Sequence, residues 1–156
     1  MDVLSARQRF ATARVARLAT VDAAGNPHLV PIVFAVSADT IYSAVDAKPK
    51  RSKALRRLAN VRANPAVCLL VDHYQDDWTA LWWVRADGHG RVIDPKDPKD
   101  PGNEEARRAV ELLAGRYPQH RREPPDGPVL AVDVTRWSGW SATDDPDQSS
   151  RGSSSE

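Results

Sequence analysis

Residues 15–36 read VARLATVDAAGNPHLVPIVFAV, and this stretch decides the fold because it predicts two neighbouring β-strands. The segment 15–21 is dense in β-forming residues, and 28–36 is apolar enough for a strand that is buried on both sides. The sequence DAAGN between them predicts a turn, in which Gly25 tolerates a positive φ angle. Because Pro31 lacks an N–H group, it must lie at a sheet edge, at a bulge or at a gap in the hydrogen-bond ladder.

Outward from this hairpin, the chain predicts further short strands connected by helices. Ser52 and Asn103 are the expected N-caps of two of these helices. The expected strands are 40–45, 66–72, 81–93 (one or two strands) and 129–137, and the expected helices are 4–14, 52–62 and 104–117. Strands and helices do not alternate along the whole chain, which argues against a Rossmann-type sheet. We therefore expect an α+β, mainly β fold, a small antiparallel barrel of about six strands with peripheral helices.

Length and composition restrict the class of protein. The 156 residues include 22 Lys and Arg against 21 Asp and Glu, which argues against a globally basic nucleic-acid-binding protein. The longest apolar run, 66–71, is far shorter than the ~20 residues that span a bilayer, and the N-terminus does not resemble a secretion signal. We therefore expect a cytoplasmic protein without membrane contact. Residues 142–156 are polar, so we expect one domain at 1–141 followed by a disordered tail.

One segment of this balanced chain carries charge of a single sign. Residues 47–71 contain no acidic residue, although seven cations lie there: Lys48, Lys50, Arg51, Lys53, Arg56, Arg57 and Arg62. Several stand at the start of the expected helix 52–62, where the macrodipole disfavours each cation by ~0.3–1 kcal/mol. An anion bound there would compensate, because helix N–H groups, a hydroxyl, Arg and Lys all converge on phosphate. The leading hypothesis is the phosphate of a small cofactor; a solvated basic face and nucleic-acid binding are the alternatives.

Other chemistry-bearing residues indicate a cofactor rather than catalytic side chains. Trp82 and Trp83 must face opposite sides of a strand, so one can fill the barrel while the other forms an interface anchor or a stacking wall for a planar ligand. Trp137 and Trp140 are expected to seal one end of the domain. The four histidines lack metal-ligand spacing, Cys68 is expected to be an inert core thiol, and no hydrolase or nucleotide-binding motif occurs. We predict no metal and no catalytic side chain, so a bound cofactor would perform any reaction.

The order of these features resembles the pyridoxamine-phosphate-oxidase-like split β-barrel family. The stretches that carry the resemblance are ARLATVDAAGNPHLVPIVF at 16–34, IYSAVDAKPKRSK at 41–53, NPAVCLLVD at 64–72 and WWVRADG at 82–88. Together they look most like the actinobacterial branch that uses the deazaflavin coenzyme F420. The resemblance covers about residues 11–141. It implies a split barrel and a homodimer with two cofactor sites at the subunit interface.

The resemblance also implies which residues hold the cofactor. One run matches the family's phosphate-binding segment, one strand would line the ring through backbone groups, and the next strand would pass beneath it. Trp78 or Trp83 would come from the partner subunit. The implied cofactor-binding set is Pro31, Ile32, Val33, Tyr42, Ser43, Ala44, Lys48, Lys50, Arg51, Ser52, Lys53, Arg57, Trp78 and Trp83.

The number of cations favours coenzyme F420 over FMN. Lys48, Arg56 and Arg57 exceed what one phosphate needs, whereas the oligoglutamate tail of the deazaflavin would use them. The prediction is an F420H2-dependent oxidoreductase that transfers a hydride between the deazaflavin ring and a small conjugated organic substrate. The alternatives are an FMN-dependent oxidase or reductase on the same fold and a non-catalytic deazaflavin-binding protein.

Overall fold

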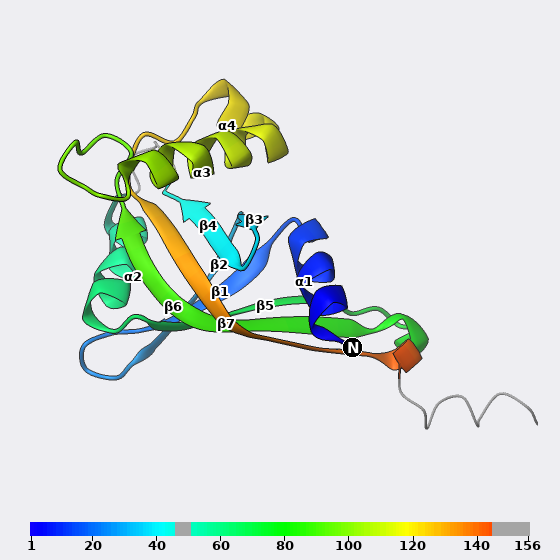
Figure 1. Cartoon of the computed structure of the whole chain (residues 1–156). Coiled ribbons are helices and arrows are strands. Elements are labelled where there is room, and N and C mark those ends of the chain that lie inside the picture. The colour runs from blue at the N-terminus through cyan, green and yellow to red at the C-terminus, as the bar shows by residue number, and fades with distance from the viewer. Residues whose placement is uncertain (46–50, 145–156) are drawn as a thin grey trace, which may run out of the picture.

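A seven-stranded antiparallel sheet organises the part of the chain that the computed structural model describes, residues 1–45 and 51–144. Its strands, in spatial order, are β2 (Pro27–Ile32), β1 (Ala16–Val21), β5 (Ala66–His73), β6 (Trp82–Ile93), β7 (Val129–Ser141), β4 (Thr40–Ala44) and β3 (Ala35–Ser37). The long strands β6 and β7 bend sharply, so the sheet has a flat part and an upright part (Figure 1). The predicted α+β, mainly β fold is confirmed, with seven strands instead of about six.

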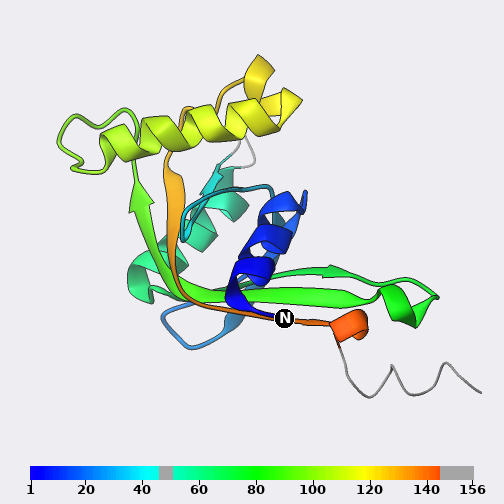
Figure 2. The ribbon, with the colours of Figure 1, turned by 45° about the vertical axis from the view of Figure 1, so that its right-hand side comes forward.

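The described residues include four α-helices: α1 (Val3–Thr12), α2 (Arg51–Ala63), α3 (Asn103–Arg116) and α4 (Pro118–Arg122). The first three pack on the sheet, and α4 packs on α3. In Figure 2, α1 lies over the flat part of β6 and β7, while α3 and α4 lie above their upright part. Helix α2 contacts β1 and β6. Within residues 1–45 and 51–144, no helix has the length and apolar character that a bilayer crossing requires.

Two hydrophobic clusters hold the elements together. In the larger one, the Phe10 ring of α1 lies 5.0 Å from the Phe34 ring and 5.3 Å from the Trp137 ring. Trp137 is thus a core residue rather than a seal at the end of the domain, and its indole N–H donates to Asp39 Oδ1 at 3.0 Å. The smaller cluster joins α3 to the sheet through Tyr42, Ala44, Ile93, Ala106, Ala109, Leu113 and Val129.

The β1–β2 hairpin has the predicted turn chemistry. Asp22 Oδ1 accepts the N–H groups of Ala24 and Asn26 at 3.0 and 2.8 Å, and Gly25 has a φ angle of +86°. Because β2 is the outermost strand on its side of the sheet, Pro31 lies on an edge strand, as predicted.

The predicted strand 28–36 is wrong in extent, because it forms two strands, β2 and β3, at opposite edges of the sheet. At the break, the Phe34 backbone bonds to the end of α3 instead of a strand. Its N–H donates to the Tyr117 hydroxyl at 3.2 Å and its carbonyl accepts from Arg116 Nη1 at 2.7 Å, so both backbone groups stay satisfied. The segment is also not buried on both sides, since Leu29 is 66% exposed.

The predicted strand region 81–93 forms one strand, β6, and its irregularity is a register shift between Asp87 and Gly88 against β7. One helix prediction needs correction. Asn103 is the first residue of α3, and Gly102 takes the N-cap position without a side-chain hydrogen bond. Helix α4 has no counterpart in the sequence prediction.

The end of the described chain is a 3₁₀ turn, η2 (Ala142–Asp144), that follows β7. Ala142 is buried, and its N–H donates to the Leu81 carbonyl at 2.9 Å. The described structure therefore continues past the domain boundary predicted at 141, and the rest of the predicted tail lies outside the described residues.

Candidate functional site

Strand β4 separates the predicted cofactor residues into two groups, because alternate side chains of a strand face opposite sides. Ser43 faces β2, and its hydroxyl donates to the Val33 carbonyl at 2.9 Å. Tyr42 and Ala44 face α3 and belong to the cluster beneath that helix. The structure thus brings Ser43 together with the end of β2 and places its two neighbours on the other side of β4.

The stretch 31–33, predicted to line the cofactor ring, lies at the end of β2 and just after it. Pro31 is exposed on the edge strand, Ile32 is buried in the larger cluster, and Val33 is half-buried just after the strand. The Ile32 side chain is therefore packed inside the protein and is not available to a ligand.

The predicted anion-binding run is only partly visible. Lys48 and Lys50 lie outside the described residues, and for Arg51, Ser52 and Lys53 only the backbone is described. Because α2 already includes Arg51, Ser52 is the second residue of this helix and not its N-cap, which corrects the prediction. The first turn of α2 contains no acidic residue.

Arg57, one turn further along α2, is a described cation whose surroundings favour a bound anion. It is half-buried, and burial lowers the pKa of its guanidinium. Among the side chains that the structure describes, those of residues 1–45 and 55–144, none forms a salt bridge or hydrogen bond with the Arg57 side chain. Asn60, on the same side of the helix, is buried and donates to Thr20 Oγ1 at 3.1 Å. A half-buried guanidinium that has no counter-charge among the described residues favours the binding of an anion, because an unpaired buried charge is costly.

The predicted aromatic residues lie away from α2. Trp78 begins η1 (Trp78–Ala80), the 3₁₀ turn after β5, and is 77% exposed. Figures 1 and 2 place this end of β5 and β6 opposite to α2 along the sheet. Trp82 packs against the core beneath Arg9, whereas Trp83 faces outward beside Trp140, so the predicted opposite orientation of the pair is confirmed. Trp78 and Trp83 can meet the α2 segment only if a second copy of the chain supplies them.

The outer face of the sheet, on the side away from α1, is uncovered in the described chain. Exposed apolar residues on it include Leu29 and Leu70, and they border a hollow of about 420 Å³. Arg17 pairs with Asp72 across this face at 3.8 Å. Cys68 also lines the hollow and is half-exposed, so the prediction of a core thiol is wrong. The alternation of β5 explains this, since the Val67 and Leu69 side chains take the core side.

A second hollow on this outer face lies further along β6 and β7. It has a volume of about 490 Å³ and is lined by Trp83, Arg85, Asp87, Thr135, Arg136 and Ser138. The Arg85 guanidinium donates to Asp87 Oδ1 through Nε at 2.9 Å. Trp83 therefore stands in a polar, charged recess rather than in a purely apolar patch.

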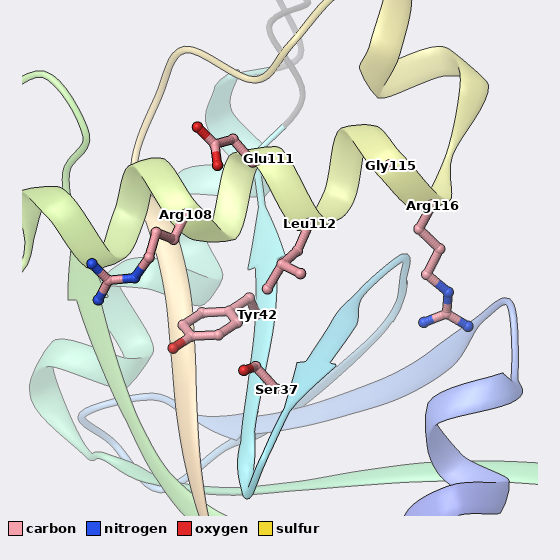
Figure 3. A pocket seen from close by; sticks show the side chains of 7 residues that line it. All are labelled: Ser37, Tyr42, Arg108, Glu111, Leu112, Gly115 and Arg116. Atoms are coloured by element: carbon pink, nitrogen blue, oxygen red, sulfur yellow. The ribbon is translucent and has the colours of Figure 1, made fainter.

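A groove lies between α3 and the β3–β4 hairpin, with a volume of about 690 Å³. Figure 3 shows its lining residues: Ser37, Tyr42, Arg108, Glu111, Leu112, Gly115 and Arg116. Of these, sequence reasoning identified only Tyr42. The others lie on α3 or β3, and no local pattern in the sequence indicates that these elements meet.

Beneath the groove, Tyr42 takes part in a network that joins β4, β6, β7 and α3. Its hydroxyl donates to Glu105 Oε2 at 2.7 Å, and Arg91 donates to both oxygens of that carboxylate at 2.7 Å. Arg91 also donates to Asp133 Oδ2 at 2.7 Å. Burial, followed by the bond to Glu105, raises the pKa of Tyr42 to about 12, whereas the bonds from Arg91 lower the pKa of Glu105 and of Asp133.

Residues 5–141 of the chain match the family model described as pyridoxamine 5'-phosphate oxidase. The chain belongs to this family. The match spans every strand and all four described helices except the first two residues of α1. A comparison with curated protein sequences gives no match.

Solved structures of low sequence identity share the fold of this pyridoxamine 5'-phosphate oxidase family member. The conserved hypothetical protein Rv2991 of Mycobacterium tuberculosis is 22% identical with a TM-score of 0.68, covering 91% of this chain and 86% of that one. A FAD-binding protein of Mesorhizobium loti is 23% identical with a TM-score of 0.64, covering 89% and 94%. HutZ, the heme storage protein of Vibrio cholerae, is 14% identical with a TM-score of 0.62, covering 90% and 95%.

Proposed function

We propose that the chain is an F420-dependent oxidoreductase that holds its cofactor between α2 and the ends of β2 and β4. The observation that carries this proposal is Arg57, a half-buried cation without a partner among the described residues, in a stretch of the sequence without acids. Family membership supports a cofactor on this fold, and the excess of cations supports a multiply anionic one.

The residues available on this side of β4 fit an anionic, planar cofactor. Arg57 would hold a phosphate or a carboxylate of the tail, together with the first turn of α2. The peptide groups after β2 would face the ring, near the Ser43 hydroxyl that fixes the Val33 carbonyl. When bound, reduced coenzyme F420 would supply a hydride to an electrophilic carbon of the substrate, while the protein excludes water and holds the two reactants together.

We also propose that the site is completed by a second copy of the chain. The outer sheet face supports this proposal, because Leu29 and Leu70 are exposed there and the charges on it, Arg17 and Asp72, are of opposite sign and suit a symmetric contact. A second copy would also bring the exposed Trp78 or Trp83 to a cofactor. Leu70→Arg should convert a dimer into a monomer in sedimentation velocity, whereas Leu4→Arg on α1 should not. A wild-type chain that sediments as a monomer at all concentrations contradicts this part of the proposal.

A flavin is the second candidate cofactor. One structure that shares the fold is a FAD-binding protein, and FMN carries a phosphate that the same cations would bind. Titration of the purified chain with coenzyme F420 and with FMN, followed by tryptophan fluorescence, separates the two. If the chain bound FMN more tightly than coenzyme F420, the proposed cofactor would be a flavin instead of the deazaflavin.

The decisive variant is Arg57→Gln, with Arg62→Gln in the last turn of α2 as the matched control. Because a hydrogen bond to a charged group contributes ~1.5–3 kcal/mol, Arg57→Gln should weaken cofactor binding by about tenfold or more. The control variant removes an exposed cation from the same helix and should bind like the parent. Equal affinity of both variants for both cofactors would refute the proposed site. Tight binding without substrate-dependent oxidation of F420H2 would indicate a non-catalytic deazaflavin-binding protein.

A further inference from the structure

The peptide that joins Val33 to Phe34 is held at both ends by side chains from two other parts of the fold. Its carbonyl, that of Val33, accepts a hydrogen bond from the Ser43 hydroxyl at 2.9 Å. Its N–H, that of Phe34, donates to the Tyr117 hydroxyl at 3.2 Å. Ser43 comes from β4, and Tyr117 is the residue that follows α3. Because a peptide unit is planar, the two bonds together fix its orientation.

The Tyr117 hydroxyl takes the place of a neighbouring strand at this break in the sheet. It lies 3.2 Å from the Phe34 nitrogen and 2.9 Å from the Phe34 carbonyl oxygen. A hydroxyl both accepts and donates, so it can pair with both backbone groups of one residue, as a strand partner does. The Phe34 carbonyl also accepts from Arg116 Nη1 at 2.7 Å. The segment between β2 and β3 is therefore ordered although no strand pairs with it.

Tyr117 is itself held from several sides. Its N–H donates to the Leu113 carbonyl at 2.9 Å, so the end of α3 determines where its backbone lies. The guanidinium carbons of Arg14 and Arg116 lie 5.8 and 5.3 Å from the centre of its ring. The His120 ring contacts it edge-on, with the ring centres 5.9 Å apart. Packed in this way, the phenol ring has little freedom to move, which fixes the position of its hydroxyl.

Arg116 contributes to this arrangement and is not a free cation. Its Nη1 and Nη2 donate to the carbonyls of Phe34 and Ala13, and its guanidinium carbon lies 4.8 Å from the centre of the Phe34 ring. Burial lowers the pKa of this guanidinium, and the two carbonyls satisfy part of its hydrogen-bonding capacity. Arg57 differs, because its side chain has no such acceptor among the described residues.

We propose that Tyr117 is a positioning residue of the proposed cofactor site. It acts through the Phe34 N–H and holds the peptide groups after β2 in the orientation that the cofactor ring meets. The inference rests on the proposed function, in which these peptide groups face the ring beside Ser43. A peptide that is already ordered need not be ordered by the ligand, so the Tyr117 hydroxyl should raise the affinity for the cofactor without touching it.

The test is Tyr117→Phe, which keeps the ring and removes the hydroxyl. Hydrogen exchange of the Phe34 amide, measured by NMR on the chain without cofactor, should become about tenfold faster, because this N–H loses its acceptor. Affinity for coenzyme F420 or FMN, whichever the parent binds more tightly, should fall by about fivefold or more, because the cofactor must then order the peptide itself. At saturating cofactor, the absorption change of the ring on binding should also decrease.

Two control variants separate positioning from a general loss of stability. Tyr74→Phe makes the same chemical change at a tyrosine that is 64% exposed, and it should leave the amide exchange and the affinity unchanged. Ala109→Gly weakens α3 at a buried position, so it should lower the urea midpoint, whereas the folded variant should bind the cofactor like the parent. An equal loss of affinity in Ala109→Gly and Tyr117→Phe would assign the effect to the stability of α3 and overturn the proposal.

Ser43→Ala removes the hydrogen bond at the other end of the same peptide, and it tests the proposal even if Tyr117→Phe does not fold. This variant should also weaken cofactor binding. In the double variant the loss of affinity should be smaller than the product of the two single losses, because either change already frees the peptide. Losses that multiply would show that the two hydroxyls do not act through one peptide, and would refute the positioning role.

The variants also distinguish a failure of this inference from a failure of the proposed function. Arg57→Gln should lose cofactor affinity without a change in the exchange of the Phe34 amide. Parent affinity in Tyr117→Phe together with lost affinity in Arg57→Gln would overturn the role of Tyr117 and leave the proposed site in place. Parent affinity in both variants would refute the proposed site and the positioning role with it.

Discussion

Replacement of Glu105 by glutamine should weaken the hydrogen bonds that join α3 to β4 and β6 and remove the charged acceptor of the Tyr42 hydroxyl. The carboxylate accepts three hydrogen bonds at 2.7 Å, one from Tyr42 and two from Arg91. A hydrogen bond to a charged group contributes ~1.5–3 kcal/mol when it is protected from solvent. The Arg91 and Glu105 side chains are 39% and 23% exposed, so solvent screens the pair substantially. We therefore expect a loss of ~2 kcal/mol in the free energy of unfolding, or roughly 4–8 °C in Tm.

Urea denaturation of the parent, Glu105→Gln, Tyr42→Phe and the double variant measures this effect and its coupling. Tyr42→Phe removes one hydrogen bond and should cost ~1 kcal/mol. In the Glu105→Gln background, Tyr42→Phe should lower the free energy of unfolding by less than it does in the parent, because the phenol has already lost its charged acceptor. Additive losses in the double variant, or an unchanged urea midpoint for Glu105→Gln, would refute the network as described.

The pH dependence of the free energy of unfolding tests the same network, and the raised pKa of Tyr42 determines its direction. Tyr42 has a pKa of about 12 in the folded chain and an ordinary pKa of about 10 when unfolded. Between these pH values the folded chain retains a proton that the unfolded chain has released. The contribution of Tyr42 to the free energy of unfolding is therefore complete below pH ~10 and decreases as the pH rises toward ~12. Ultraviolet difference spectra should show tyrosine ionisation near pH 12, and Tyr42→Phe should remove that component. If Tyr42→Phe removed a component that ionises near pH 10 instead, the reasoning would be contradicted.

Three further outcomes follow from other parts of the structure. Gly88→Ala should lower the free energy of unfolding in urea by several kcal/mol, about as much as a severe core substitution, because the added Cβ would overlap the Asp133 carbonyl oxygen. Gly127→Ala is the control, because an added Cβ there meets open space and should not destabilise the chain. Asn60→Leu should cost ~1–3 kcal/mol in urea denaturation, since the Thr20 hydroxyl, 1% exposed, loses its partner. The Arg91 bonds depress the pKa of Asp133, so its stabilisation should be lost as the pH falls below ~4, and acid titration by circular dichroism of Asp133→Asn should show a weaker transition there.

Local chemistry made part of the fold predictable from the sequence. The DAAGN turn, the edge position of Pro31 and the end of α2 before Asn64-Pro65 all depend on a few adjacent residues. The opposite orientation of Trp82 and Trp83 follows from the strand period alone. These features need no knowledge of which elements meet in space.

The break after β2 and the groove depend on contacts between distant segments. Phe34 leaves the sheet because Arg116 and Tyr117, more than 80 residues later, satisfy its backbone. Tyr42 and Glu105 meet across 63 residues. An apolar run such as 28–36 fits one long strand equally well until these partners are known, so sequence reasoning gave a single strand and missed the α3 wall of the groove.

The alternation of β4 also restricts where a substrate can reach the proposed cofactor site. Ser43 and Ile41 face the side of α2 and the end of β2, whereas Tyr42 and Ala44 face α3 and the groove. Hydride transfer requires the donor and acceptor carbons to approach within ~3–3.5 Å, which is less than the thickness of a strand. A cofactor held beside Ser43 therefore cannot react through β4 with a molecule beside Tyr42, and its substrate must approach on the Ser43 side of the strand.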